Sequence, residues 1–370
     1  MNFDLSGEQE LFRDSVTRFA DSIDGAARRQ LRGAPGGYSR ERWTELAELG
    51  PIALAADESD GGMGGSPIDL AIVAEALGRA IAPEPWLENG VLPARLLAAA
   101  GATAPLAGLL GGVLGGVLDG SRFIAVAFAE RGQRYNLAPK AVTARRRGGQ
   151  IVLQGEKTFV LGGALADDFA VSALLDGQAA WFLVPGDCAG AFRHPYRLAD
   201  GSVACEIRFT DAEVSADSLL PIGDAGLDGV VALVRLLAAA EMLGLAQRLF
   251  DDTLAYVKQR EQFGVAIGSF QALQHRLVDC YAALEQSRST VYRVALMARE
   301  DRAGWNRAAA GAKAYVGAQA DLIAREAVQM HGGMGITDEL SIGHAMKRVL
   351  LLSRLFGDEQ AVLTDYAEAA

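Results

Sequence analysis

The stretch Arg260-Glu-Gln-Phe-Gly-Val-Ala-Ile-Gly-Ser-Phe-Gln271 lies between long segments with helical periodicity. Before it, residues 227–259 are apolar almost all round, which is typical of a helix that is buried on most sides. After it, residues 270–299 and 305–330 repeat the helical spacing of apolar side chains. The C-terminal part of the chain, residues 226–370, is therefore predicted to form a bundle of long helices.

The middle of the chain has short apolar runs that are bounded by glycine, aspartate or proline. Val203, Cys205, Ile207 and Phe209 alternate with their neighbours, as the residues of a half-buried strand do. Because the turns between the runs are short, we expect antiparallel pairing. Residues 118–225 are therefore predicted to form a small β barrel or sandwich.

The first third of the chain, residues 1–117, is predicted to be helical. Ser6 and Gln9 form a capping-box pattern ahead of apolar residues at helical spacing, and a second helix is predicted over residues 68–80. Residues 96–118 contain no charged side chain and are long enough to cross a bilayer. No aromatic belt or basic flank accompanies them, so we expect a soluble helix pair that is broken at Pro105.

The order helical, then β, then helical indicates an α+β protein. A strand-rich segment between helical segments excludes a continuous doubly wound sheet. No G-x-G-x-x-G follows a strand and no G-K-[ST] sequence occurs, so a nucleotide would have to bind in another way.

Composition narrows the class of protein further. The net charge of −11 argues against nucleic acid as the main partner. Cys188, Cys205 and Cys280 form no C-x-x-C pair, and the histidines lack metal-ligand spacing, so no zinc site or disulfide framework is expected. Asp4 and Glu8 do not fit a secretory signal, so we expect a cytoplasmic protein.

The quoted stretch and a second one, Gln329-Met-His-Gly-Gly-Met-Gly335, carry groups that suit a phosphate-bearing ligand. Arg260 supplies a cation for phosphate, and Phe263 supplies an apolar face for a ring. Gly332 and Gly333 lack a Cβ and allow the backbone to approach a ligand closely. A simple helix C-cap is the competing structural explanation for the glycine pair.

These two stretches resemble the acyl-CoA dehydrogenase patterns R-x-[TQ]-F-G-x-x-[IL]-x-x-x-Q and Q-x-x-G-G-x-G, in the family's order and at a similar separation. The three-part layout resembles the family along the whole chain. Within the family, the chain is most similar to the small subunit of pimeloyl-CoA dehydrogenase. That similarity rests on the pair Arg134-Tyr135 and on the stretch Leu355-Phe-Gly-Asp358.

The resemblance implies FAD as the cofactor, an acyl-CoA substrate and electron-transfer flavoprotein as a partner. In family members the two stretches belong to different subunits of one FAD site, so a dimer at least, and usually a tetramer, is implied. The residues carried over by the resemblance are Arg260, Gln262, Phe263, Phe270, Gln271, Gln329, Gly332, Gly333, Phe159 and Gly357 for the cofactor, and Arg235 for the substrate.

The family reaction needs a carboxylate that removes the substrate's α proton while a hydride passes to the flavin. Most members carry this glutamate before a glycine near the C-terminus, and that position here is Phe356. A minority carry it before an arginine on the first C-terminal helix, where Val234 precedes Arg235. Both usual base positions therefore lack a carboxylate.

Other carboxylates are candidates for the missing base. Glu241 follows Val234 by seven residues, so it shares a helix face with that position but lies about 10 Å along the axis. The competing explanation is a buried glutamate paired with a cation. Asp358 and Glu359 follow Gly357, where the family contacts FAD, and Glu359 reaches back only if the loop folds differently.

The flavin-contact stretches depart from the family as well. The family's T-E-P-x-x-G-S-D appears as residues 129–136, which begin with Ala129, and its W-[IV]-T appears as Phe159-Val-Leu161. A leucine cannot replace the threonine hydroxyl. The adenosine and pyrophosphate half of the site is therefore better kept than the isoalloxazine half.

Three interpretations follow from these losses. The chain is a paired subunit of a hetero-oligomer whose second subunit bears the glutamate, or an active homotetramer whose base lies elsewhere. In the third interpretation it is a structural or binding homologue without FAD. The lost base and hydroxyls favour the paired subunit, and the retained stretches argue against loss of FAD.

Overall fold

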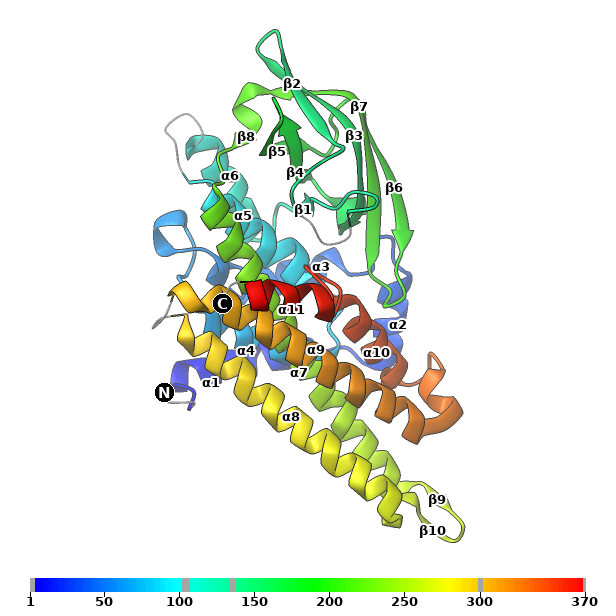
Figure 1. The fold of residues 1–370 in the computed structure, drawn as a ribbon. Helices are drawn as coiled ribbons and strands as arrows, with labels where there is room; N and C mark the ends of the chain where they lie inside the picture. The colour runs from blue at the N-terminus through cyan, green and yellow to red at the C-terminus, as the bar shows by residue number, and fades with distance from the viewer. Residues whose placement is uncertain (1–3, 102–106, 134–136, 299–301, 369–370) are drawn as a thin grey trace. The chain divides into compact units, whose positions relative to one another are not determined.

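The computed structural model describes residues 4–101, 107–133, 137–298 and 302–368 (Figure 1). Helices precede and follow a sheet-forming segment, so the predicted α+β architecture with a central β domain is confirmed. The chain divides into two compact units. The first unit comprises residues 1–30, 67–82 and 232–370, and the second comprises residues 31–66 and 83–231.

The N-terminal helices of the first unit form where the sequence predicts them. In α1 (Gly7–Ala20) the Ser6 hydroxyl accepts from the Gln9 amide and the Gln9 side chain accepts from the Ser6 amide, which completes the predicted capping box. Apolar residues at helical spacing give α4 (Pro67–Ala80) a largely buried surface. Helix α2 (Gly25–Gly33), which was not predicted, follows α1 and ends within the second unit.

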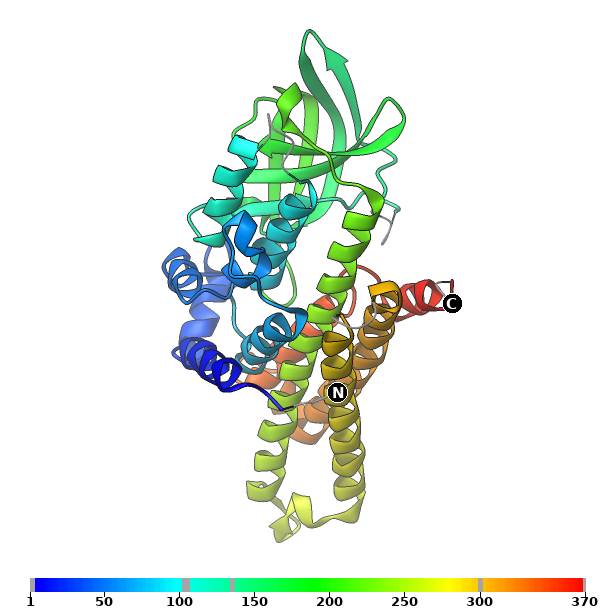
Figure 2. The same cartoon turned by 90° about the vertical axis from the view of Figure 1, so that its left-hand side faces the viewer.

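Long helices make up the rest of the first unit (Figure 2). The segments predicted at residues 227–259, 270–299 and 305–330 are confirmed as helices, with ends that differ by a few residues. Glycines let α4 and α7 approach closely, because a Cβ on Gly78 or Gly244 would collide with the Glu241 or Glu75 carbonyl oxygen. The helices are α7 (Asp224–Gln259), α8 (Gln271–Met297), α9 (Arg302–His331), α10 (Ser341–Leu352) and α11 (Glu359–Glu368).

The described part of the chain has one helix that is long and apolar enough to cross a membrane, α7. Its most apolar window is 83% buried within the fold, as is typical of a core helix. The uncharged stretch at residues 96–118 instead contributes to two separate helices, α5 (Leu92–Ala99) and α6 (Ala107–Leu118). Pro105, where we expected the break, lies outside the described residues.

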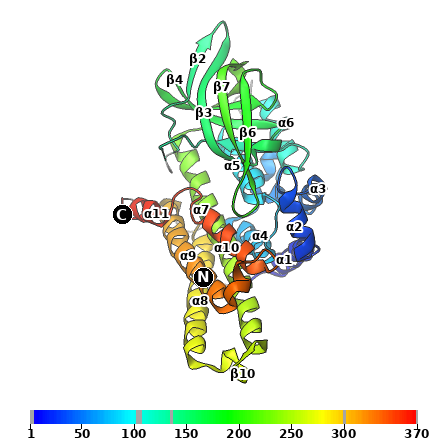
Figure 3. The same cartoon turned by 90° about the vertical axis from the view of Figure 1, so that its right-hand side faces the viewer.

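The second unit contains α3 (Arg40–Glu48), α5, α6 and an eight-stranded sheet in the order β6-β7-β3-β2-β4-β5-β8, with β1 beside β4 (Figure 3). In β7 Val203, Cys205, Ile207 and Phe209 are buried as predicted, and Arg208 is exposed, but Ala204 is buried as well, so the alternation is clear only from Ile207 onward. The strands are β1 (Ile124–Ala127), β2 (Thr143–Arg147), β3 (Gln150–Leu161), β4 (Asp168–Leu175), β5 (Gln178–Pro185), β6 (Ala191–Arg197), β7 (Val203–Ser215) and β8 (Leu219–Leu220).

The expectation of antiparallel pairing holds for most strand pairs of this sheet but is wrong for two of them. Strands β1 and β2 both pair with β4 in parallel, while the remaining pairs of this sheet are antiparallel. Short turns fix the direction only of strands that are consecutive in the sequence. Strand β4 pairs with β1 and β2 across intervening chain, and turn length carries no information about such pairs.

Candidate functional site

The stretch Arg260–Gln271 begins with a tight hairpin at the end of α7. Strand β9 (Glu261–Gln262) pairs with β10 (Val265–Ala266), and the turn residues Phe263 and Gly264 have φ angles of +57° and +80°. Positive φ at both turn positions is the pattern of a type I′ turn. The left-handed conformation costs a phenylalanine about 1 kcal/mol, and its side chain is 94% exposed. Phe263 is therefore an apolar residue that is both strained and exposed.

The second stretch ends α9 and turns away through Gly332, whose φ angle is +61°. A Cβ built on Gly332 or Gly333 meets no described atom within 4 Å, so both backbones face open space. Gln329 is also exposed. His331 is buried and its Nδ1 donates to the Ala327 carbonyl oxygen (2.8 Å), which indicates a structural role.

Core packing brings the two stretches to the same end of the bundle. Tyr256 stacks on His331 with ring centroids 4.3 Å apart, and Val257 shares a buried cluster with Met330. The hairpin lies at this end of α7 and α8 (Figure 2). The residues that we call the bundle-end surface are all exposed: Arg260, Gln262, Phe263, Phe270, Gln271, Gln329, Gly332 and Gly333.

The bundle-end surface has the chemistry that an adenosine and a pyrophosphate require. The rings of Phe263 and Phe270 lie edge to face, 6.2 Å apart, and offer apolar surface to a flat base. Arg260 offers an exposed guanidinium for phosphate, and the glycine backbone at 332–333 offers close approach. The residues present therefore fit this half of an FAD molecule.

The usual base position lies in a turn between α10 and α11, which we call the 353–357 turn. Phe356 is 6% exposed and has a φ angle of +55°, and Gly357 has a φ angle of +115°. The Phe356 carbonyl oxygen accepts from Arg235 Nε at 3.1 Å, and the Arg235 guanidinium also forms an ion pair with Asp365 of α11. Arg235, which the resemblance assigns to substrate, thus supports this turn. Val234, at the alternative base position, is 1% exposed.

Lys313 of α9 supports the same turn from another helix. Its side chain is buried, and its Nζ donates to the carbonyl oxygens of Ser353 (3.1 Å) and Gly357. Burial, and to a smaller degree the charge of Arg235, lower the pKa of Lys313 to about 7, against the opposing effect of Asp358.

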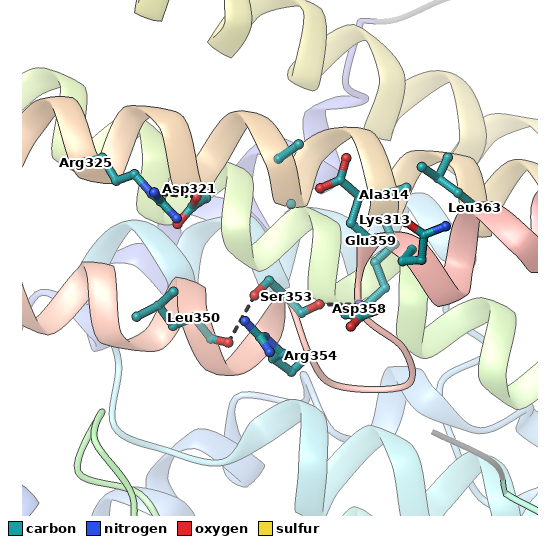
Figure 4. Close-up of a pocket in the computed structure, with 13 residues that line it drawn as sticks. Lys313, Ala314, Asp321, Arg325, Leu350, Ser353, Arg354, Asp358, Glu359 and Leu363 are labelled. Atoms are coloured by element: carbon teal, nitrogen blue, oxygen red, sulfur yellow. Dashed lines mark hydrogen bonds and ion pairs between the residues drawn. The ribbon is translucent and has the colours of Figure 1, made fainter. Parts of the chain in front are cut away.

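A pocket of about 440 Å³ lies beside the turn, between α9, α10 and α11 (Figure 4). Charged groups of both signs and a few apolar side chains form its wall. The lining residues are Lys313, Ala314, Gly317, Ala318, Asp321, Arg325, Leu350, Ser353, Arg354, Asp358, Glu359, Gln360 and Leu363.

The candidate replacement bases have other partners or positions. Glu241 is 8% exposed and its Oε1 accepts from Arg348 Nε at 2.6 Å, which is the buried ion pair of the competing explanation. Asp358 caps α11, since its carboxylate accepts from the Ala361 amide at 3.0 Å. Glu359 begins α11 and lines the pocket.

In the second unit, Phe159 projects from an irregularity in β3. Its φ angle is +55° and the pairing register with β7 shifts between Lys157 and Val160, so the chain bulges and Phe159 is 36% exposed. Ala129 and Leu161, at the family's hydroxyl positions, are half-buried. Arg134 and Tyr135 lie outside the described residues.

A buried ion pair joins Glu130, in the 129–136 stretch, to Lys157, which precedes Phe159 in β3. Lys157 Nζ donates to Glu130 Oε1 (2.8 Å), Ser172 Oγ (2.9 Å) and the Phe128 carbonyl oxygen (3.0 Å), so all three ammonium protons have acceptors. Burial lowers the pKa of Lys157 to about 8, although Glu130 opposes this shift.

Glu130 in turn fixes the chain that leads into β2. Its carboxylate accepts from the backbone amides of Lys140 (3.0 Å), Ala141 (2.7 Å) and Val142 (3.2 Å). Burial alone would raise the pKa of Glu130, but the hydrogen bonds from Lys157 and from these amides favour the charged form and lower it.

Sequence reasoning missed both buried lysines. The signal that was available is a lysine inside an otherwise apolar pattern, as in Ala312-Lys313-Ala314 and in the strand that contains Lys157. A charge in such a place is buried by its neighbours and needs acceptors in the fold.

Comparison with known proteins agrees with this geometry. Residues 6–105 match the family model "Acyl-CoA dehydrogenase, N-terminal domain", and residues 229–370 match "Acyl-CoA dehydrogenase, C-terminal domain". The chain is 30% identical to the acyl-CoA dehydrogenase IpdE2 of Mycolicibacterium smegmatis, over 95% of this chain and 96% of that protein.

Two solved structures are similar over nearly the whole chain. The Tcur3481-Tcur3483 steroid ACAD is 28% identical with a TM-score of 0.86, covering 98% of this chain and 97% of that one. The ChsE4-ChsE5 complex from Mycobacterium tuberculosis is 27% identical with a TM-score of 0.88, covering 100% and 98%. The chain belongs to the acyl-CoA dehydrogenase family and is an FAD-dependent oxidoreductase of that class.

Proposed function

We propose that this chain is the glutamate-lacking subunit of a hetero-oligomeric acyl-CoA dehydrogenase, which oxidises the α,β bond of an acyl-CoA thioester. The observation that carries the proposal is Phe356, buried in the 353–357 turn where the family places its base. A phenyl ring accepts no proton, and a positioned base accelerates such a step by about 10²–10⁴-fold. The chain alone is therefore expected to be inactive or very slow.

The bundle-end surface gives this subunit its role in the assembly. In the proposal, this chain contributes either the Arg260–Gln271 stretch or the backbone at Gly332 and Gly333 to an FAD whose flavin lies over the partner's glutamate. Phe263 and Phe270 contribute apolar faces to the adenine. When bound, FAD supplies the acceptor for the substrate's β hydride. An apolar, strained and exposed Phe263 supports an interface here.

The residues at the family's flavin-contact positions also support the proposal that the partner subunit carries the catalytic site. Ala129 and Leu161 stand where the family has hydroxyls, so they offer the flavin edge no side-chain hydrogen bond. The first turn of α11 begins with Glu359 and is capped by the Asp358 carboxylate. The two negative charges at the start of this helix would repel a phosphate.

The two similar structures named above support a paired assembly by analogy. One is described by two protein names, Tcur3481-Tcur3483, and the other is named as a ChsE4-ChsE5 complex. A tetramer, electron-transfer flavoprotein as the electron acceptor, a cytoplasmic location and the pimeloyl-CoA dehydrogenase subtype remain expectations that follow from the family resemblance.

An active homotetramer with a relocated base is the second candidate, and Glu241 is its named base. The ion pair with Arg348 at 2.6 Å speaks against this role, because the pair stabilises the charged carboxylate and occupies it. A homologue that has lost FAD is the third, and the retained bundle-end surface argues against it.

The proposal is tested by co-expressing the chain with an acyl-CoA dehydrogenase-like chain that carries the glutamate. We expect the two to co-purify with flavin and to bleach on anaerobic addition of acyl-CoA. Substituting the partner's glutamate by glutamine should slow bleaching by about 10²–10⁴-fold, whereas Glu241→Gln in this chain should leave the rate unchanged. Loss of bleaching in Glu241→Gln, with the partner's glutamate dispensable, would support the relocated base instead.

A further inference from the structure

We propose that Lys313 is a positioning residue: it ties down the 353–357 turn from the α9 side and thereby fixes what the chain presents at position 356. The inference deepens the proposed function, because this turn carries the family's base position. It does not depend on a partner subunit or on bound FAD, since it concerns contacts within one chain.

Two cationic side chains on two different helices donate hydrogen bonds to backbone oxygens of the turn. Lys313 Nζ holds the carbonyl oxygens of Ser353 and Gly357, which flank the turn, and Arg235 Nε holds that of Phe356 between them. The turn's own backbone adds the bond from the Gly357 amide to the Arg354 carbonyl oxygen, at 3.2 Å. Lys313 thus closes the two ends of the turn on one nitrogen.

The conformation held in this way is one that the sequence of the turn does not favour. Phe356 has a φ angle of +55°, in the left-handed region that costs a residue with a Cβ about 1–2 kcal/mol. Such a conformation persists where surrounding contacts hold it. The side chains of Lys313 and Arg235 supply such contacts, because they donate to backbone oxygens of the turn.

A pocket lies on one side of the turn. Ser353, Arg354 and Asp358 line the pocket together with Lys313, so the turn borders open space of about 440 Å³ (Figure 4). The hydrogen bonds from Lys313 of α9 to backbone oxygens hold the turn in place, as close packing holds other parts of a core.

The chemistry of Lys313 suits a tether better than a charge partner. Its two acceptors are neutral carbonyl oxygens, and burial lowers its pKa to about 7. A neutral amine still has two protons to donate, so both hydrogen bonds persist in either charge state. Burying this group is unfavourable without such bonds, which favours a specific role over passive filling.

Hydrogen exchange measured on the purified full-length chain tests this inference. In Lys313→Met, amides of residues 354–358 should exchange at least about tenfold faster, while peptides from α8 keep the wild-type rate. Lys313→Arg restores donors, and the neighbouring pocket has room for a larger head group, so it should regain most of the protection. Lys347→Met removes a half-buried lysine of α10 that pairs with Asp338, away from residues 353–357, and should change nothing at the turn.

Two results would overturn the inference: unchanged exchange at residues 354–358 in Lys313→Met, or an increase spread evenly over the whole bundle. If Lys313→Met does not fold, Lys313→Gln keeps an amide donor on a shorter side chain and is measured instead, with Lys157→Met as the control for loss of a buried lysine elsewhere. Activity of the chain without a partner would contradict the proposed function but leave these exchange rates as predicted.

Discussion

Two phenylalanines of this chain adopt the same unfavourable backbone conformation in opposite surroundings. Phe263 has a φ angle of +57° and is 94% exposed on the bundle-end surface, whereas Phe356 has a φ angle of +55° and is 6% exposed in the 353–357 turn. The hairpin between β9 and β10 holds the first, and two cationic side chains hold the second. The same strain therefore has two different causes.

The two phenylalanines mark a part of the family site that the chain resembles and a part where it lacks the usual residue. The exposed phenylalanine stands beside Arg260 in a surface that suits cofactor and subunit contact. The buried one stands where a catalytic carboxylate would be, in a turn whose supports, Arg235 and Lys313, are still present. In the proposed assembly, the turn at the family's usual base position lacks the reacting group, and the bundle-end surface serves another subunit's site.

The largest expected effect concerns Glu241. If Glu241 were the catalytic base, the chain would not lack a base, and the contrast between the two regions would fail. Arg348→Met leaves the Glu241 carboxylate buried without its cation, and we expect the free energy of unfolding to fall by about 3–5 kcal/mol. Urea denaturation measures this loss. Glu241→Gln, which keeps the size of the side chain, should leave flavin reduction by the assembled enzyme unchanged, whereas a large loss of activity in folded protein would identify Glu241 as a base.

The next effect concerns the bundle-end surface. Arg260→Ala removes the cation assigned to the pyrophosphate, so FAD retention should weaken by about 1.5–3 kcal/mol through loss of charge-assisted hydrogen bonds. Equilibrium dialysis of FAD from the assembled enzyme gives this value. Arg18→Ala, which removes an exposed arginine of α1, should leave retention unchanged. Equal retention in both variants would contradict the assignment of Arg260.

The third prediction concerns pH and Lys313. The folded chain releases the lysine proton near pH 7, whereas the unfolded chain holds it to about 10.5, so between these values unfolding takes up a proton. Raising the pH must therefore stabilise the wild type relative to Lys313→Met, with a slope of at most about 1.4 kcal/mol per pH unit. Parallel denaturation series between pH 7 and 10 test the sign; a difference that is independent of pH would contradict it.

The smallest effect concerns the strain at Phe263. Asparagine tolerates the left-handed conformation and precedes glycine in the preferred type I′ turn. Phe263→Asn should therefore stabilise the isolated chain by about 1 kcal/mol while weakening FAD retention in the assembly. Opposite signs in these two measurements would confirm that the exposed strain serves contact, and a loss in both would mean that Phe263 stabilises the chain itself.

The sequence predicted the architecture well where periodicity is strong. The long helical patterns became α7, α8 and α9, and the Ser6–Gln9 capping box formed as expected. The parallel pairing of β4 could not be predicted from the sequence, because short turns give no information about strands that are not consecutive. Local pattern fixed the elements, and contacts between distant segments fixed the sheet.

Some features of the candidate site could likewise be predicted from the sequence, and others could not. The exposure of the bundle-end surface follows from residues such as Arg260 and Gln329, which lie within two short stretches. The support of the 353–357 turn does not, since Lys313 and Arg235 meet it from helices far away in the sequence. The partner of Glu241 was likewise expected only as an unnamed cation, and the fold identifies it as Arg348.

Anaerobic mixing of the purified chain alone, supplied with FAD, with a panel of acyl-CoA thioesters tests the central claim most directly. The flavin absorbance reports hydride transfer, and Phe356 at the base position predicts that it persists or decays only slowly. Adding the partner that carries the glutamate should then produce rapid bleaching. Rapid bleaching by this chain without any partner would contradict the account.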